Sequence, residues 1–249
     1  MDRKKRFEIF DLKLDSLTME ETIQEVKKYI ENGVKCQHVV LNAGKVVLAN
    51  KNENLRNVIN DCEIINADGQ SVVWAARFLG NRIPERVAGI DLMYNLLSLA
   101  EKNGYGVYFF GAREEVLGKA IQAITGLYPK LIVSGKRNGY FTDKDIASII
   151  EDMNNSKAKM LFVGFSSPMK EFWLKQHMPQ INIPFCMGVG GSFDVAAGTT
   201  KRAPLWMQKL GLEWFYRFLQ EPGRMWRRYL VGNMEFIKLT IKAKLSKAG

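Results

Sequence analysis

The feature that most constrains this chain is a regular alternation of short apolar stretches with amphipathic stretches from residue 105 onward. The apolar stretches lie at residues 106–110, 130–134, 159–163 and 184–188. Helix-like stretches follow the first three, at residues 113–125, 143–154 and 169–178. Because parallel strands need long crossovers, this alternation predicts a mostly parallel sheet with helices on both faces. We therefore predict an α/β, Rossmann-like fold.

The first hundred residues fit the same fold. A strand is expected over residues 7–14, and the sequence from Thr18 to Glu21 fits a capping box that opens a helix. That helix is expected to run to about Asn32. Two more strands are expected to end at Asn42 and at the turn beginning with Asp68. Further helices are expected over residues 70–79 and 89–102.

The positive charge of the chain is concentrated in its last fifth. The 249 residues carry a formal charge of +10, and residues 201–249 hold 11 Lys or Arg against 3 Asp or Glu. The first 200 residues therefore contribute only about +2, and we predict an α/β domain over 1–200 followed by a basic helical appendage over 201–249. Nucleic-acid binding is not expected, since basic residues are scarce elsewhere and no nucleic-acid-binding motif is present.

The appendage has the pattern of a helix that lies on a membrane. At 3.6 residues per turn, one apolar stripe is formed by Trp226, Leu230, Met234, Ile237, Ile241 and Leu245. Lysines and arginines lie beside this stripe, as in interfacial helices on anionic lipid. The alternative is a terminal helix docked on the core. With no signal peptide and no apolar run of about 18 residues, a cytoplasmic protein, peripheral on the inner face of the cell membrane, is expected.

No metal or cofactor site is expected from the residues. The three cysteines have no metal-binding spacing, and the chain has only two histidines. The sequence TDKD at 142–145 contains a DxD pair, which holds a metal in many glycosyltransferases. Here Thr142 is placed to cap a helix whose first turn is acidic, so we interpret the pair as capping residues.

Glycines and small polar residues gather after the predicted strands, where ligands bind in open parallel sheets. The sequence GVGGSFD at 188–194 could cradle a phosphate or simply form a tight turn. It is not GxGxxG, which counts against a nicotinamide-dependent oxidoreductase. Asp68 is either a turn former or a catalytic carboxylate, and Arg86 in the following loop is suited to an anion.

Three longer motifs together resemble the WecG/TagA/CpsF glycosyltransferases. These motifs are NADGQSVVWAARFLGNRIPERVAGIDL, GVGGSFDVAAGTTKRAP and GLEWFYRFLQEPGRMWRRY. The resemblance implies a bacterial, inverting, metal-independent transferase. It would move an N-acetylmannosamine-type or related sugar from a UDP donor to a polyprenyl-diphosphate-linked saccharide. Its products would enter teichoic acid or other cell-surface polysaccharides.

The resemblance also assigns residues. The general base falls on Asp68, pocket residues on Asn42 and Arg86, and the aspartate of the nucleotide-sugar loop on Asp194. The appendage arginines of the family fall on Arg217, Arg224 and Arg227. Two positions depart from the family pattern: Lys170 replaces a glutamine and Val40 a threonine, so the donor sugar is left open.

The diphosphate that leaves in such a reaction gains negative charge, which cations or backbone N–H groups must stabilise. We assign this role to Arg86 and to backbone N–H groups of two loops, with Gly111 in one and Gly190 and Gly191 in the other. Lys170 is expected to contact substrate. A non-catalytic UDP-sugar-binding scaffold on the membrane stays as the alternative function, and a homo-oligomer stays open.

Overall fold

The computed structural model describes residues 6–220, 222–223 and 232–246. Its strands are β1 (Arg6–Ile9), β2 (Leu12–Asp15), β3 (Cys36–Leu41), β4 (Ile64–Ala67), β5 (Val107–Gly111), β6 (Val133–Arg137), β7 (Met160–Gly164) and β8 (Phe185–Gly188). Strands β3 to β8 form one sheet in the order β4-β3-β8-β7-β5-β6, and every pairing in it is parallel. The predicted α/β fold is confirmed.

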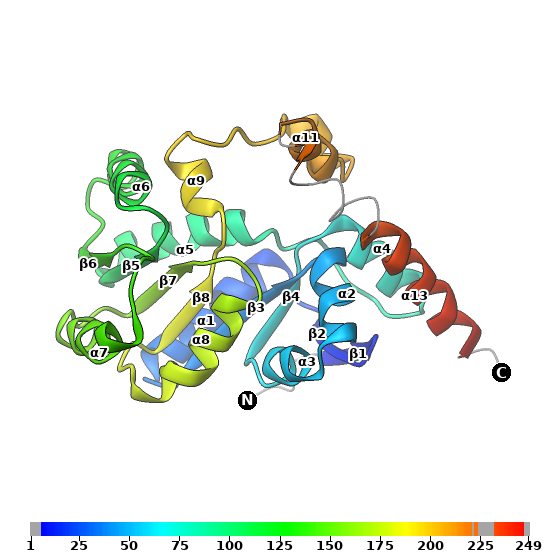
Figure 1. Cartoon of the computed structure of the whole chain (residues 1–249), viewed down its shortest axis with the longest axis horizontal. Helices are drawn as coiled ribbons and strands as arrows, with labels where there is room; N and C mark the ends of the chain where they lie inside the picture. Colours follow the sequence, from blue (N-terminus) through cyan, green and yellow to red (C-terminus); the bar gives the residue numbers. More distant parts are fainter. Residues whose placement is uncertain (1–5, 221, 224–231, 247–249) are drawn as a thin grey trace.

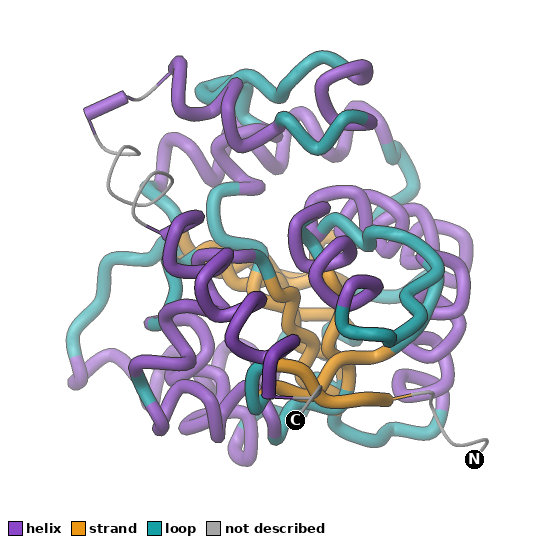
Figure 2. Tube along the Cα trace, turned by 90° about the vertical axis from the view of Figure 1, so that its right-hand side faces the viewer, coloured by secondary structure: helices purple, strands orange, loops and turns teal. Residues whose placement is uncertain are grey.

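Helices cover both faces of this sheet (Figures 1 and 2). The helices of the α/β part are α1 (Met19–Glu31), α2 (Ala43–Lys51), α3 (Glu53–Asn60), α4 (Gln70–Phe78), α5 (Gly89–Asn103), α6 (Glu114–Leu127), α7 (Ile146–Asn155), α8 (Met169–His177) and α9 (Ser192–Ala196). Two single turns of 3₁₀ helix are η1 (Asp143–Asp145) and η2 (Met178–Gln180). The appendage contributes α10 (Leu205–Lys209), α11 (Glu213–Gln220) and α13 (Gly232–Ser246).

Local sequence signals explain several of these boundaries. The predicted capping box is confirmed: Thr18 and Glu21 exchange side-chain contacts with each other's backbone N–H. Thr142 and Asp145 form a second capping box, which confirms the interpretation of TDKD. Helix α7 begins only after the η1 turn, so the expected helix at 143–154 has a tighter first turn.

Two predicted strands are corrected. Residues 7–14 form a hairpin, not one strand, because the chain turns at Phe10 and Asp11, where φ is 55° and 58°. Phe-Asp is not a common sequence for a turn with positive φ, so this turn could not be predicted from the sequence. The strand expected at 130–134 lies at Val133–Arg137. Apolar residues alone placed it too early by about three positions.

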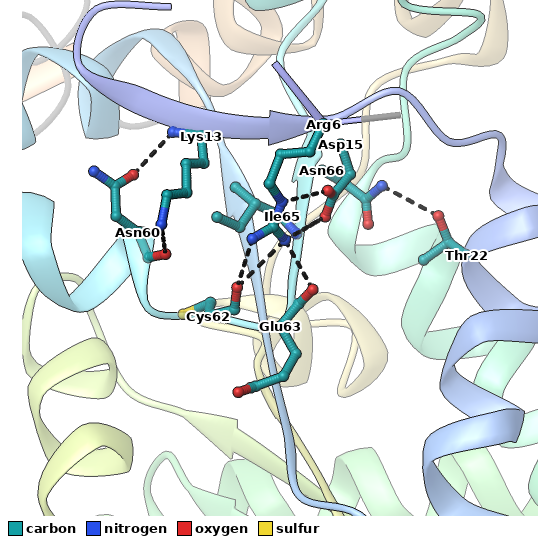
Figure 3. A network of polar contacts seen from close by, with 9 residues as sticks. All are labelled: Arg6, Lys13, Asp15, Thr22, Asn60, Cys62, Glu63, Ile65 and Asn66. Carbon is teal, nitrogen blue, oxygen red and sulfur yellow. Dashed lines mark hydrogen bonds and ion pairs between the residues drawn. The ribbon is translucent and has the colours of Figure 1, made fainter. Parts of the chain in front are cut away.

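The hairpin β1–β2 is fixed to strand β4 by a buried carboxylate (Figure 3). Asp15 is 1% exposed, accepts two hydrogen bonds from the Arg6 guanidinium at 2.6 and 2.9 Å, and accepts the Ile65 N–H at 2.8 Å. Arg6 also donates to the Glu63 carbonyl at 2.8 Å. β4 is an edge strand, so its outer backbone N–H groups have no neighbouring strand to bond with. The Asp15 carboxylate accepts one of these groups, the Ile65 N–H.

The strand order creates a crevice between β3 and β8. Strand β3 leads into α2, whose side chains belong to the core cluster on one face, whereas β8 leads into α9, whose Phe193 belongs to the cluster on the other face. The connection after β3 passes to one face of the sheet and the connection after β8 passes to the other. A gap therefore remains between the two connections at the carboxyl edge. This is the position where open α/β sheets bind ligands.

Helix α13 of the appendage packs beside α2 (Figure 1). Phe236 is 5% exposed, belongs to the core cluster of α2, and meets the Phe10 ring edge-on with ring centroids 5.5 Å apart. The structure describes four residues of the predicted stripe, and their exposed fractions are 52–68%: Met234, Ile237, Ile241 and Leu245. The helix is therefore docked through one face and leaves the stripe uncovered.

We expect Phe236→Ala to lower the free energy of unfolding by about 3 kcal/mol, because it removes a buried ring from a packed site. Ile237→Ala is the matched control: the neighbouring side chain is 56% exposed, and its loss should change stability by no more than about 0.5 kcal/mol. Chemical denaturation of both variants measures the difference. Equal stabilities would show that α13 is not held through Phe236.

Candidate functional site

A cavity of 1110 Å³ opens at the carboxyl edge of the sheet and extends under the appendage. Its walls come from the loops after β3, β4 and β8, from the start of α8, and from α11 and α13. Seven of the predicted site residues line it: Asn42, Asp68, Arg86, Lys170, Gly190, Gly191 and Asp194. The fold therefore brings together residues that are up to about 150 positions apart in the chain.

Asp68 is held rigidly at the cavity wall. Its N–H donates to the Leu41 carbonyl at 2.8 Å, and its Oδ1 accepts the Gly89 N–H at 3.0 Å, at the first turn of α5. Burial raises the pKa of Asp68 above its ordinary value, although the Gly89 N–H and the Arg86 charge oppose the change. A fixed carboxylate with a raised pKa is a better proton acceptor than an exposed one.

Arg86 is part of a chain of four charged groups that ties the appendage to the α/β core. Its Nη1 lies 3.1 Å from Glu213 Oε2, and Glu213 Oε1 lies 3.3 Å from Arg202 Nε. Arg202 in turn donates two hydrogen bonds to Asp91, at 2.5 and 2.8 Å. Glu213 and Arg202 line the cavity, so this chain closes one side of it with residues of the appendage.

Asn42 and Lys45 occupy the first turn of α2 at the cavity floor. Asn42 Oδ1 caps the helix by accepting the Lys45 N–H at 3.0 Å, which fixes the carboxamide at the wall. Lys45 Nζ forms an ion pair with Glu171 Oε1 at 2.7 Å, and the two side chains are only 4% and 2% exposed.

Sequence reasoning missed several cavity residues. Lys45, Arg202 and Glu213 line the cavity, yet none was singled out. A signal existed for two of them, because Arg202 lies in the KRAP part and Glu213 in the GLEW part of the motifs quoted above. Lys45 had no such signal, since a lysine in an apolar helix is usually a solvent-facing residue.

Gly111 is not brought to the cavity. It ends β5 with φ of +125°, and a Cβ built there would lie 2.7–2.8 Å from backbone atoms of Gly164 on β7. The glycine thus allows two strand ends to approach closely. Its role toward a diphosphate stays a prediction.

The appendage arginines are only partly described. The backbone of Arg217 lies in α11, but its side chain is outside the described part of the structure. Arg224 and Arg227 lie outside the described residues altogether, as do Trp226 and Leu230 of the apolar stripe. Their roles also stay predictions.

Two further features of the described residues bear on the kind of site. Across residues 6–220, 222–223 and 232–246, no three His, Cys, Asp or Glu side chains are grouped so that they could hold a metal ion. Within the same residues, no helix combines the length and the apolar character needed to cross a membrane.

The fold is that of an α/β protein with a candidate ligand site at the carboxyl edge of a parallel sheet, where a carboxylate and several cations line the cavity. A family model described as "Glycosyl transferase WecG/TagA/CpsF family" matches residues 7–249. The chain belongs to this family and is a glycosyltransferase.

Two curated relatives support the same assignment. A Bacillus subtilis (strain 168) protein is 31% identical over 204 residues, which cover 82% of this chain and 78% of the relative. A Staphylococcus aureus (strain MW2) protein is 30% identical over 245 residues, which cover 98% of this chain and 96% of the relative. Both relatives are named N-acetylglucosaminyldiphosphoundecaprenol N-acetyl-beta-D-mannosaminyltransferase.

Proposed function

We propose that this glycosyltransferase moves an N-acetylmannosamine-type or related sugar from a UDP donor to a polyprenyl-diphosphate-linked saccharide, with inversion and without a metal ion. The names of the two relatives support the acceptor and the sugar class. The observation that carries the mechanism is Asp68, fixed on the wall of the cavity with a raised pKa. An inverting displacement needs such a base, whereas a sugar-binding scaffold does not.

The proposed step is one displacement. The acceptor hydroxyl oxygen attacks the anomeric carbon as its proton passes to Asp68, and the bond from that carbon to the diphosphate oxygen breaks. The electron pair leaves with UDP. Attack from the side opposite the leaving group inverts the anomeric centre, and a positioned base of this kind contributes about 10²–10⁴-fold to the rate.

The departing diphosphate gains negative charge, which Arg86 and the N–H groups of the loop with Gly190 and Gly191 would stabilise. Arg86 pairs with Glu213 in the structure. On donor binding, Arg86 would therefore exchange the Glu213 carboxylate for the diphosphate. Glu213 would keep its contact with Arg202, which would hold the appendage in place.

We also propose that the protein works as a peripheral protein on the inner face of the cell membrane. Exposed apolar side chains occur on each appendage helix that the structure describes: Leu205 and Trp206 on α10, Leu219 on α11 and the stripe on α13. Ile237 and Ile241 of that stripe also line the cavity. A lipid-linked acceptor could then enter from the membrane directly along α13.

The test is direct transfer. Purified full-length protein is incubated with a panel of UDP-sugars and a short-chain polyprenyl-diphosphate acceptor, with and without EDTA, and products are analysed by mass spectrometry and NMR. We expect a glycosylated acceptor, UDP release, a β-linkage from an α-linked donor, and no loss of rate with EDTA. A retained configuration or an EDTA-sensitive rate would contradict the mechanism.

A further inference from the structure

The cavity has a polar end and an apolar end. The polar end holds Asp68, Arg86 and Asp194, where the transfer is proposed to take place. The other end lies between helices α2, α4 and α13, and we call it the apolar groove. The apolar side chains that line it include Leu48, Trp74, Phe78, Phe236, Ile237 and Ile241.

Two large aromatic side chains on α4 form one wall of the apolar groove. Trp74 and Phe78 line the cavity, yet they are 56% and 54% exposed. They lie four positions apart, so they share one face of the helix. Large apolar side chains that stay exposed together mark a surface that binds a ligand, a partner or a membrane.

Helix α13 supplies the opposite wall. Ile237 and Ile241 of the exposed stripe are also four positions apart, and both line the cavity. Met234 and Leu245, at the two ends of the described stripe, are equally exposed but are not among the residues that line it. The stripe therefore borders the groove in its middle and continues beyond the groove on the surface of the appendage.

The two walls meet at the end of the groove that is remote from Asp68. Lys244 Nζ of α13 donates to the carbonyl of Phe78, the last residue of α4, at 3.0 Å and lies 5.1 Å from the centre of the Phe78 ring. Figure 1 shows the two helices together at one end of the molecule. Asp68 lies just before α4, so the groove starts beside this carboxylate and follows α4 for roughly 12 Å from Gln70 to Phe78, at 1.5 Å per residue.

The polarity of the lining changes along this path. Gln70 and Ser71 in the first turn of α4, and Asn233 at the start of α13, are polar residues that line the cavity. Further along, the hydroxyl of Thr240 donates to the Phe236 carbonyl of its own helix at 2.8 Å. A sugar or a nucleotide needs hydrogen-bonding groups that this outer part does not supply, whereas a hydrocarbon chain needs only apolar surface.

We propose that the apolar groove binds the first prenyl units of the acceptor lipid while the acceptor sugar lies at Asp68. This inference rests on the proposed function. The sugar, the diphosphate and the polyprenyl chain of such an acceptor are joined in one molecule. When the sugar hydroxyl reaches Asp68, the chain therefore has to leave the cavity, and the groove between α4 and α13 is an exit lined by apolar side chains. Trp74 and Phe78 are then residues that bind the acceptor.

The test measures binding of two acceptor analogues to the full-length protein by calorimetry, with saturating UDP and without vesicles or detergent. Both analogues are N-acetylglucosaminyl diphosphates: one is a farnesyl ester, used below the concentration at which it forms micelles, and the other is an ethyl ester. We expect the Kd of the farnesyl ester to be lower by at least about 10-fold, because only its chain reaches the apolar groove. Equal Kd values would overturn the inference.

The double variant Trp74→Ser with Phe78→Ser removes one wall of the groove. We expect it to weaken binding of the farnesyl ester by at least about 10-fold and to change the Kd of the ethyl ester and of UDP by less than about 3-fold. Ile241→Ser changes the opposite wall and should shift the same Kd in the same direction, which keeps the test available if the double variant folds poorly. If both variants fold and keep the full preference for the farnesyl ester, the inference is wrong.

The control is Leu127→Ser with Ile132→Ser. These apolar side chains are 65% and 49% exposed, and neither is among the residues that line the cavity. This pair should leave every Kd unchanged. Co-sedimentation with anionic liposomes tests the other source of apolar chains: if the Trp74 and Phe78 variant loses liposome binding but keeps both acceptor Kd values, the aromatic pair contacts the bilayer and the inference is overturned.

The outcomes also separate this inference from the proposed function. If wild-type protein binds UDP and both esters with no preference for the farnesyl chain, the inference is wrong and the proposed function stands. If wild-type protein binds UDP but neither ester, the proposed acceptor is contradicted and the inference falls with it. If it binds no UDP, the proposed donor is contradicted, and the comparison of the two esters without UDP still decides whether the groove binds a prenyl chain.

Discussion

Asp68→Asn is expected to reduce turnover by about 10²–10⁴-fold while leaving UDP affinity unchanged within about 3-fold. Asparagine has nearly the same shape as aspartate, and its Oδ1 can still accept the Gly89 N–H, so the loop should keep its structure. It cannot take the proton of an acceptor hydroxyl. Steady-state kinetics and calorimetry with UDP measure the two quantities. Asp143→Asn is a control, because that carboxylate is exposed and outside the cavity lining.

The pH dependence gives a second measurement of the same carboxylate. Because burial raises the pKa of Asp68, kcat/KM of the wild type should rise with pH through a value above the ordinary 3.8 of an aspartate. This acid limb should be absent from the residual activity of Asp68→Asn. Near-normal turnover, or an unchanged acid limb in the variant, would remove Asp68 from the mechanism.

The raised pKa also predicts the sign of the change in stability. A carboxyl whose pKa is higher in the folded state contributes stability below its unfolded pKa, and this contribution is lost as the pH rises through the folded pKa. Ionised Asp68 therefore costs stability at pH 7, and Asp68→Asn should have a higher Tm than the wild type there. The difference should vanish in acid. A lower Tm at pH 7 would indicate that Asp68 is a structural turn residue instead.

Replacing Met234, Ile237, Ile241 and Leu245 together by serine is expected to weaken binding to anionic liposomes by at least about 100-fold. Full burial of each such side chain contributes about 1.5–3 kcal/mol, and even about 0.75 kcal/mol each amounts to about 3 kcal/mol. The four side chains are exposed in the structure, so the fold should survive. Liposome co-sedimentation measures the effect.

The control for this variant is a pair of equally exposed apolar residues far from the appendage in sequence. Leu127 at the end of α6 and Ile132 before β6 are 65% and 49% exposed. Serine at both positions should leave liposome binding unchanged. If the α13 variant still binds liposomes normally, the stripe is not the membrane contact.

Point variants are preferable here to a chain that ends near residue 200. Phe236 belongs to the core cluster that includes residues of β1, β2 and α2, so removal of the appendage would uncover buried apolar surface. A truncated chain would then combine loss of membrane contact with loss of stability. The serine variant leaves Phe236 in place; because Ile237 and Ile241 also line the cavity, liposome binding rather than transfer is its readout for membrane contact.

Sequence reasoning located best the site residues that lie directly after predicted strands. A parallel sheet directs its ligands to the carboxyl ends of its strands, so Asn42, Asp68 and Gly190 could be placed near one another from chain order alone. Lys45 and Glu171 could not, because an ion pair between helices α2 and α8 depends on side-chain packing that no local pattern records. The turn at Phe10 could not be predicted either, because Phe-Asp is not a common sequence for residues with positive φ.

By itself, the sequence determined the α/β class, the capping residues at Thr18–Glu21 and Thr142–Asp145, and the edge of the sheet where the cavity lies, because these follow from periodicity and from chemistry within a few residues. Only the tertiary structure decided which face of α13 docks, since Phe236 and Ile237 are equally apolar and differ only in what lies opposite them. The pairing of Arg86 with Glu213 and the buried ion pair of Lys45 with Glu171 were likewise decided by contacts between segments far apart in the chain.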